Sequence, residues 1–288
     1  MRQGILLSII SAVSFGLVPL FTKVVLDLNF DVYAIGFFRF LGLGIFSYCM
    51  LRLKKQSLKM DGRQLFSIGI DSFFQVITLL LLSTSYLYIP TGNATSLHFM
   101  YPIFVFLILF LYYKNRFSRT QWFALVISIV GILFFIEFKD LNNGYGMALA
   151  VISGFTYACY MVVLDKQGLA ALNPFVVAFY ACLMEVVVLF CICLLKGSFN
   201  VIWNWQAAGS LFLLVGLSIS GVLLLQVSTR LIGSATASLF CLFEPLTSLF
   251  CGWLILKDTM QFSNIIGCLL IFTGIFLIMK PKRRKVYG

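Results

Sequence analysis

The sequence predicts an all-α integral membrane protein of ten transmembrane helices, arranged as two inverted five-helix repeats with both termini in the cytoplasm. Hydrophobic residues make up 61% of the 288 residues, charged residues make up 11%, and the mean hydropathy is +1.02. The apolar residues occur in runs of about 20, the length that crosses a bilayer. Lysine and arginine concentrate in alternate connections between these runs.

Ten apolar runs are long enough to be spans. They cover approximately residues 4–25, 32–51, 65–87, 91–113, 120–138, 144–164, 174–195, 207–229, 235–256 and 262–280. The connections are short, so we expect no extramembrane domain. The first run continues to Val25, which is longer than the apolar region of a secretory signal peptide, so it is interpreted as a retained span.

The positive charges predict the orientation. With the N-terminus in the cytoplasm, 16 of the 21 lysines and arginines face the cytoplasm, 4 face the outside, and Arg39 lies within a span. This asymmetry follows the positive-inside rule. The basic segment 281–288 is then a cytoplasmic tail close to lipid headgroups. We expect a multi-pass protein of a bacterial cell (inner) membrane.

The two halves of the chain resemble each other. Pro102 and Pro245 lie 143 residues apart, and the same offset aligns Tyr101 with Glu244. Stripes of small residues at positions 4, 8, 12, 16 and 146, 150, 154, 158 align at an offset of 142. Because each half has five spans, the second half enters the membrane from the opposite side. The expected units are residues 1–140 and 144–280, with the tail at 281–288. Inverted repeats are typical of secondary transporters with a midplane substrate site.

These features resemble the drug/metabolite transporter superfamily, in its EamA-like branch. The resemblance is carried by residues 92–102, 233–245 and 252–258, by the pair Phe15-Gly16 and by Arg39 in the second span. The chain departs from the family pattern in having Asn115 where an acidic residue is usual; Asp258 keeps that acidic residue in the second half. The resemblance implies a secondary transporter, often an exporter, of small metabolites such as amino acids. It also implies a cavity lined mainly by the first, third, fourth, sixth, eighth and ninth spans.

The candidate substrate site lies where the fourth and ninth spans reach the midplane. Tyr101 lies about 15 Å into its span and Glu244 about 14 Å into its own. Each precedes a proline, which frees a backbone carbonyl one turn earlier, at Leu97 or His98 and at Phe240 or Cys241. The residues expected to bind substrate are Glu244, Tyr101, His98, Thr95, Ser238, Cys241, Phe15 and Tyr157. The alternative is a neutral buried glutamate beside prolines that only shape the helices.

Coupling or gating candidates are Asp71, Gln75, Arg39, Pro102 and Pro245. A charge inside the bilayer is costly, so an ionisable residue there normally faces a cavity or a partner. Asp71 either lines the cytoplasmic vestibule, carries a coupling proton, or reaches toward the interface.

Three further ionisable residues have two interpretations each. Arg39 either binds a substrate carboxylate or locks helices together. Glu185 either pairs with Arg39 or faces the outer vestibule. His98, the only histidine, either binds or relays a proton or is a core residue.

Several functions are excluded by what the sequence lacks. It carries no Walker loop, no G-x-S-x-G and no H-E-x-x-H, so we expect no enzyme, no cofactor, no metal and no nucleic-acid partner. The expected partners are a small-molecule substrate, the lipid bilayer and, as a candidate coupling ion, the proton. Two alternatives remain open: a flippase for a lipid-linked substrate, and a non-transporting scaffold or enzyme subunit.

Overall fold

The computed structural model describes residues 1–136, 143–199, 203–256 and 261–279, and within them the chain is helical with no strand. The elements are α1 (Arg2–Leu26), α2 (Val32–Leu53), α3 (Gly62–Ser85), α4 (Thr91–His98), α5 (Tyr101–Leu111), α6 (Arg119–Leu133), α7 (Gly144–Lys166), η2 (Leu169–Ala171), α8 (Pro174–Lys196), α9 (Trp205–Phe240), α10 (Phe243–Cys251), η3 (Gly252–Leu256) and α11 (Phe262–Met279). The tail at 281–288 and Asp258 lie outside the described residues.

The length of the helices supports membrane spanning. Seven helical segments are long and apolar enough to cross a bilayer: α1, α2, α3, α7, α8, α9 and the α4–α5 stretch taken together. Three shorter apolar helices cover 119–133, 243–255 and 262–278. The predicted all-helical membrane class is therefore confirmed for the described residues.

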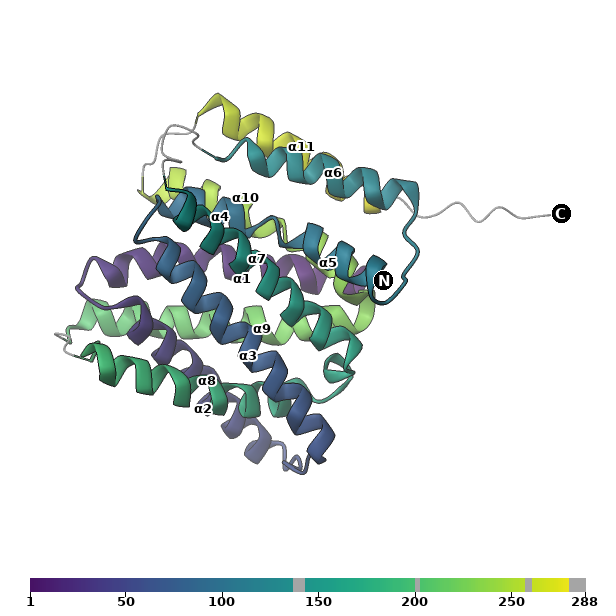
Figure 1. The fold of residues 1–288 in the computed structure, drawn as a ribbon. Coiled ribbons are helices and arrows are strands. Elements are labelled where there is room, and N and C mark those ends of the chain that lie inside the picture. The colour runs from purple at the N-terminus through teal and green to yellow at the C-terminus, as the bar shows by residue number, and fades with distance from the viewer. Residues whose placement is uncertain (137–142, 200–202, 257–260, 280–288) are drawn as a thin grey trace.

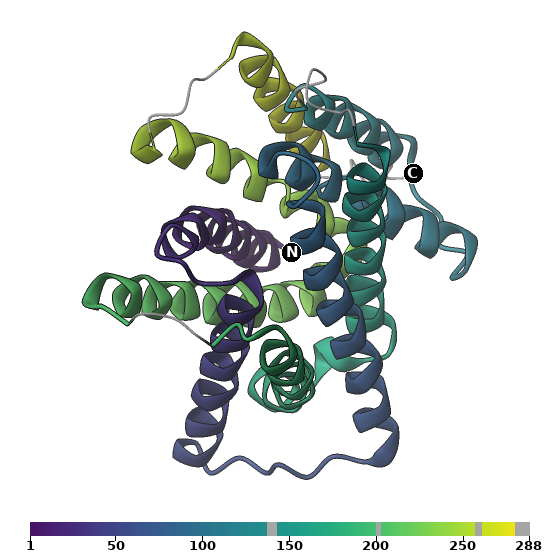
Figure 2. The same cartoon turned by 60° about the vertical axis from the view of Figure 1, so that its left-hand side comes forward.

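The helices pack mainly in pairs that are distant in sequence. Helix α1 lies along α9, α3 along α7, α2 along α8, and α6 along α11. Figure 1 shows α6 and α11 together at one end of the molecule and α2 and α8 at the other. In Figure 2, turned by 60°, α1 again lies between α9 and α10. Helices α4 and α5 pack on α7, whereas α10 packs on α1.

Side-chain caps fix where many of the helices begin. Asp61 and Gln64 form a capping box at the start of α3, and Ser118 and Gln121 form one at the start of α6. Asparagine side chains accept hydrogen bonds from the first turn of α7, α8 and α9. These caps satisfy amide N–H groups that the first turn of a helix leaves unpaired.

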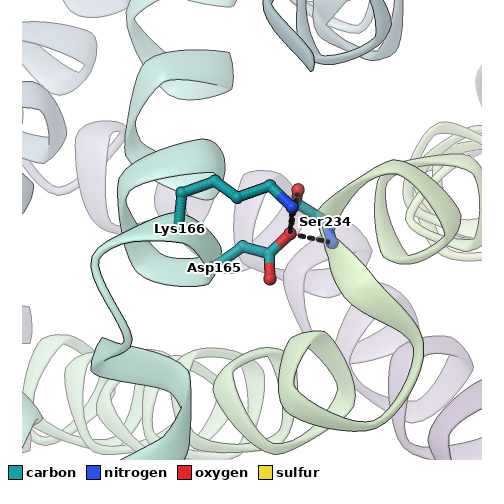
Figure 3. Close-up of polar contacts among 3 residues, drawn as sticks. All are labelled: Asp165, Lys166 and Ser234. Atoms are coloured by element: carbon teal, nitrogen blue, oxygen red, sulfur yellow. Dashed lines mark hydrogen bonds and ion pairs between the residues drawn. The ribbon is translucent and has the colours of Figure 1, made fainter. Parts of the chain in front are cut away.

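Helix α9 contains an abrupt change of direction near one end. Gly233 has φ 76° and ψ 157°, a conformation that favours glycine. The sequence predicts a boundary between two spans at 229–235. In the structure, Gly233 is the one residue of this boundary with a non-helical backbone conformation. The Asp165 carboxylate at the end of α7 accepts hydrogen bonds from Ser234 N (3.1 Å) and Ser234 Oγ (2.7 Å) (Figure 3). Asp165 belongs to a different helix, but its carboxylate does what an N-cap side chain does: it accepts hydrogen bonds at the start of the helix segment that follows Gly233.

Replacing Asp165 by alanine is expected to lower stability by about 1–2 kcal/mol, because two donors of Ser234 lose their acceptor. The melting temperature of the detergent-purified protein measures this. Lys166→Ala is the matched control: Lys166 Nζ lies 3.7 Å from the Asp165 carboxylate, but the pair is 28% and 20% exposed, and exposed ion pairs contribute little. Equal loss in both variants would contradict the capping role.

Candidate functional site

Two spans are interrupted near their middle. Helix α4 ends at His98 and α5 begins at Tyr101, with Pro102 in its first turn. Helix α9 ends at Phe240 and α10 begins at Phe243, with Pro245 in its first turn. A proline has no N–H to donate and clashes with a continuing helix, which explains both interruptions. Both breaks lie inside predicted spans, 91–113 and 235–256, beside the two prolines that the sequence analysis expected to free a backbone carbonyl.

The carbonyl groups at the breaks are largely occupied by the protein itself. Met100 N donates to the Leu97 carbonyl oxygen (3.2 Å), and Glu244 N donates to that of Cys241 (2.9 Å). The His98 carbonyl oxygen lies against α7, where a Cβ on Gly154 would come within 2.7 Å of it. Of the four candidate positions for a freed carbonyl, Leu97, His98 and Cys241 are thus bonded or covered.

Glycines on α1 and α7 allow the two breaks to be approached closely. Gly154 of α7 lies on the break that follows α4, as above. On the other side, a Cβ on Gly16 of α1 would come within 2.6 Å of the Glu244 carbonyl oxygen. Real Cβ atoms do not approach backbone oxygens so closely, so both positions require glycine. Each break is therefore crossed by a helix from the other half of the chain.

Aromatic side chains converge beside the first break. The Tyr101 and Tyr157 rings are 4.8 Å apart, and His98 lies 5.8 Å from Tyr101 and 5.3 Å from Tyr157 between centroids. His98 Nδ1 is 3.0 Å from Ser153 Oγ, which orients the imidazole. Tyr101 is completely buried, and its hydroxyl has no hydrogen-bond partner among the described residues. The Cys241 thiol, a weak hydrogen-bonding group, lies near this hydroxyl, so a polar ligand can take its place as partner.

Glu244 reaches the same cluster from the second break. Its carboxyl group interacts electrostatically with Tyr101, Tyr157 and Arg39. Within the described part of the chain, no side-chain nitrogen of lysine, arginine or histidine lies within 4.0 Å of it. Cys241, one turn earlier, lies beside Ser8 of α1, with Sγ and Oγ 3.8 Å apart. The partly buried carboxyl group is therefore coupled electrostatically to the tyrosines of the cluster without a direct ion pair.

The remaining predicted residues are less directly placed. Thr95 Oγ1 donates to the carbonyl oxygens of Thr91 and Gly92, and Ser238 Oγ donates to that of Ala235. Both hydroxyls thus bond their own helix. Phe15 packs on α9, where a Cβ on Gly221 would lie 2.8 Å from its ring. The structure brings together Glu244, Tyr101, His98, Tyr157 and Cys241, which we call the central cluster.

A second polar group lies between α2, α3, α7, α8 and α9. A small pocket there has room for roughly one water molecule. Its polar lining consists of Asp71, Gln75, Tyr160, Cys182, Glu185 and Gln226. We call this the acidic pocket. The sequence predicts Asp71 and Gln75 as coupling or gating residues, and the structure places both in it.

Arg39 is coupled electrostatically to an acid of each site. Its Nε donates to Ser218 Oγ (2.9 Å), and it interacts electrostatically with both Glu244 and Glu185. No ion pair within 4.0 Å joins Arg39 to either acid in the described chain. Arg39 therefore interacts electrostatically with both acids but forms an ion pair with neither of them in the described chain.

Sequence reasoning did not identify Ser153, Gln226 or Tyr86. Ser153 is buried on α7, beside the stripe of small residues. It lies one helical turn before Tyr157, so its position in the sequence could have indicated a site residue. Gln226 is 2% exposed on α9, and a glutamine inside an apolar span was a second signal. Tyr86, just beyond α3, interacts with Arg39 and Glu244, and no sequence pattern indicated that.

Comparison with known proteins agrees with this architecture. A family model described as the EamA-like transporter family matches residues 2–136 and 144–280. An uncharacterized transporter of Archaeoglobus fulgidus is 25% identical over 228 residues, which cover 77% of this chain and 79% of that protein. An uncharacterized transporter of Synechocystis sp. is 25% identical over 217 residues, 73% of this chain; the match spans 65% of that protein's length, slightly less than two thirds.

A solved crystal structure has the same fold, with a TM-score of 0.78 at 13% sequence identity over 97% of each chain. The family model covers nearly the whole sequence in two matches. The resemblance stated from the sequence is thereby confirmed, and so is the expectation that the protein is not an enzyme. The chain belongs to the EamA-like transporter family, whose members are multi-pass membrane transporters.

Proposed function

We propose that the protein is a secondary active transporter, working as an exporter, of a small polar metabolite such as an amino acid or a related amine. Substrate binds at the central cluster, and access alternates between the two sides of a bacterial inner membrane. The observation that carries the proposal is the convergence of two interrupted helices on one carboxyl group, three aromatic rings and an unpartnered hydroxyl.

Ten spans with both termini in the cytoplasm fit the helices. The seven long segments and the three shorter ones account for all ten when α9 is divided at Gly233 and its second part continues through α10. The proposed inverted repeat is supported by the packing, because the main helix pairs correspond when the halves are exchanged: α1 pairs with α9 as α7 pairs with α3, and α10 packs on α1 as α4 and α5 pack on α7.

The chemistry of the central cluster suits a protonated amine. A carboxylate supplies the opposite charge, and the faces of Tyr101 and Tyr157 attract cations. The free Tyr101 hydroxyl can donate to a polar group on the substrate. Tyr101, His98 and Cys241 are buried in this structure, so substrate contact with them requires helices to separate at one end. The Asp165–Ser234 hydrogen bond joins the end of α7 to α9. Breaking this bond allows the two helices to separate there.

Glu244→Gln is expected to abolish binding of the amine. A thermal-shift screen of the detergent-purified protein against amino acids, amines, nucleosides and sugars measures this. A ligand at 100 times its Kd stabilises the folded protein by about 2.7 kcal/mol, and that shift disappears when the carboxylate is removed. Asp27→Asn, an exposed acid at the end of α1, is the matched control and keeps the full shift.

Other outcomes of the screen separate the alternatives. A shift with long-chain lipids and none with soluble metabolites would replace the proposal with a lipid-linked substrate flippase. No shift with any compound, together with unchanged function when all midplane polar residues are replaced, would favour a scaffold. A metabolite shift that survives Glu244→Gln would place the binding site elsewhere.

Tyr101→Phe separates ligand binding from structure. Because the buried hydroxyl has no partner, its removal is expected to leave the melting temperature unchanged or slightly raised. Affinity for the substrate found in the screen is expected to fall about tenfold, the effect of losing one hydrogen bond to a polar ligand. Calorimetric titration measures it, with Tyr33→Phe at the start of α2 as control. A lower melting temperature with unchanged affinity would show a structural role only.

A further inference from the structure

We propose that Asp71 and Glu185 form a carboxyl pair that holds one shared proton, and that this pair is the proton-coupling site of the transporter. The pair lies in the acidic pocket, apart from the central cluster. Its role in transport rests on the function proposed above, whereas the presence of the shared proton does not.

The two carboxyl groups are buried and incompletely bonded. Asp71 and Glu185 are each 1% exposed, and both line the same pocket. Asp71 Oδ1 and Glu185 Oε1 have no hydrogen-bond partner among the described residues. An unpaired carboxylate oxygen away from water is strongly unfavourable. Two such oxygens on side chains that line one small pocket point to a positively charged ligand or a proton at the pair.

The neighbouring amides do not supply the missing donors. Gln75 Nε2 donates to the other Asp71 oxygen, Oδ2 (3.2 Å). Gln226 Nε2 donates to the backbone carbonyl oxygen of Leu169 (3.0 Å). A backbone carbonyl only accepts, so this bond fixes which end of the Gln226 amide is the NH2 group. The amide oxygen of Gln226 is then one more acceptor at an already acceptor-rich pocket.

No cation neutralises the pair directly. The titratable and charged groups that face it are Tyr160 from α7, Cys182 from α8 and Arg39 from α2. The Cys182 thiol, a weak donor, is a hydrogen-bonding neighbour of Glu185, but Glu185 Oε1 still has no partner. Arg39 interacts with Glu185 but forms no ion pair within 4.0 Å in the described chain, and its Nε donates to Ser218. Two adjacent carboxylates in a low-dielectric site cannot both remain charged. A proton shared between them removes one charge and supplies the missing donor.

The pocket fits a proton better than a metal ion. It has room for roughly one water molecule, and hard cations require about six oxygen ligands in regular geometry. Among the described residues, no group of three or more His, Cys, Asp or Glu is arranged to hold a metal. The proton needs only the two carboxyl oxygens. It arrives from one side of the membrane, binds one carboxylate oxygen, and leaves to the other side, with no other bond changed.

Arg39 and Tyr160 connect the acidic pocket to the central cluster. The Tyr160 ring lies 5.4 Å from that of Tyr157, and Arg39 interacts with both Glu185 and Glu244. When the pair has released its proton, the added negative charge draws Arg39 toward Glu185 and leaves Glu244 free for an amine. When the proton binds, Arg39 turns to Glu244 and displaces the substrate. Proton and substrate therefore bind in turn, which is the requirement for exchange of one against the other.

Infrared spectroscopy of the full-length protein in lipid tests the pair without any substrate. The probe is the proton, followed by the C=O band of protonated carboxylic acids as pH is raised in choline chloride. Wild type is expected to keep a band from the pair at neutral pH. In Asp71→Asn and in Glu185→Gln the band is half lost at a pH lower by about one unit or more, because the repulsion is gone. The double variant loses the band.

Two control variants and two contrary outcomes make the infrared test specific to the Asp71–Glu185 pair. Ser72→Ala, next to Asp71 and bonded only within α3, leaves the band unchanged, and Glu244→Gln removes only its own component. If neither single variant moves the titration, the carboxyls share no proton. If sodium chloride suppresses the wild-type band relative to choline chloride, the site binds sodium instead. That comparison needs no variant, so it holds even if the substitutions prevent folding.

The infrared experiment and the ligand screen test two different proposals, so one proposal can be overturned while the other stands. Loss of the shared proton would leave substrate binding at Glu244 intact. Absence of any metabolite ligand would leave the proton band in place and remove only its assignment to transport coupling.

Discussion

A membrane-spanning backbone must satisfy its own hydrogen bonds, because the hydrocarbon offers no partner. The two helix breaks that build the central cluster violate this requirement locally, and the rest of the structure compensates. Carbonyls at Leu97 and Cys241 are taken by N–H groups a turn away. Those of His98 and Glu244 are covered by α7 and α1 at Gly154 and Gly16. The small-residue stripes thus serve the site directly, because only glycine lets a helix cross a break at this distance.

The same constraint governs the charged side chains. An uncompensated charge inside the bilayer costs roughly 2.5–3.5 kcal/mol even on insertion scales. Three acids therefore occupy the interior near one cation, Arg39, which reaches Glu244 and Glu185 electrostatically. One arginine cannot neutralise both acids at once. This imbalance gives the interior two electrostatic states, and we regard it as the basis of coupling between substrate and proton.

Much of this arrangement could be predicted from the sequence. The prolines located both breaks, and the 143-residue offset linked Tyr101 with Glu244. The small-residue stripes, which indicated that the first and sixth spans are central, also indicated Tyr157. The acidic pocket could not be predicted as a unit, because its lining comes from five helices. In lipid these helices are apolar all round, so periodicity does not show which faces meet.

Local hydrogen bonds were the other limit of prediction. Thr95 and Ser238 have the residue types and positions of ligand contacts, yet their hydroxyls bond their own helices.

We infer that both breaks together form one ligand site. Hydrogen exchange of the backbone amides, with and without the bound metabolite, tests it most directly. If both breaks contact the bound metabolite, exchange slows at residues 98–101 and 241–244 together. Protection at only one break, or only in the connecting loops, would contradict it.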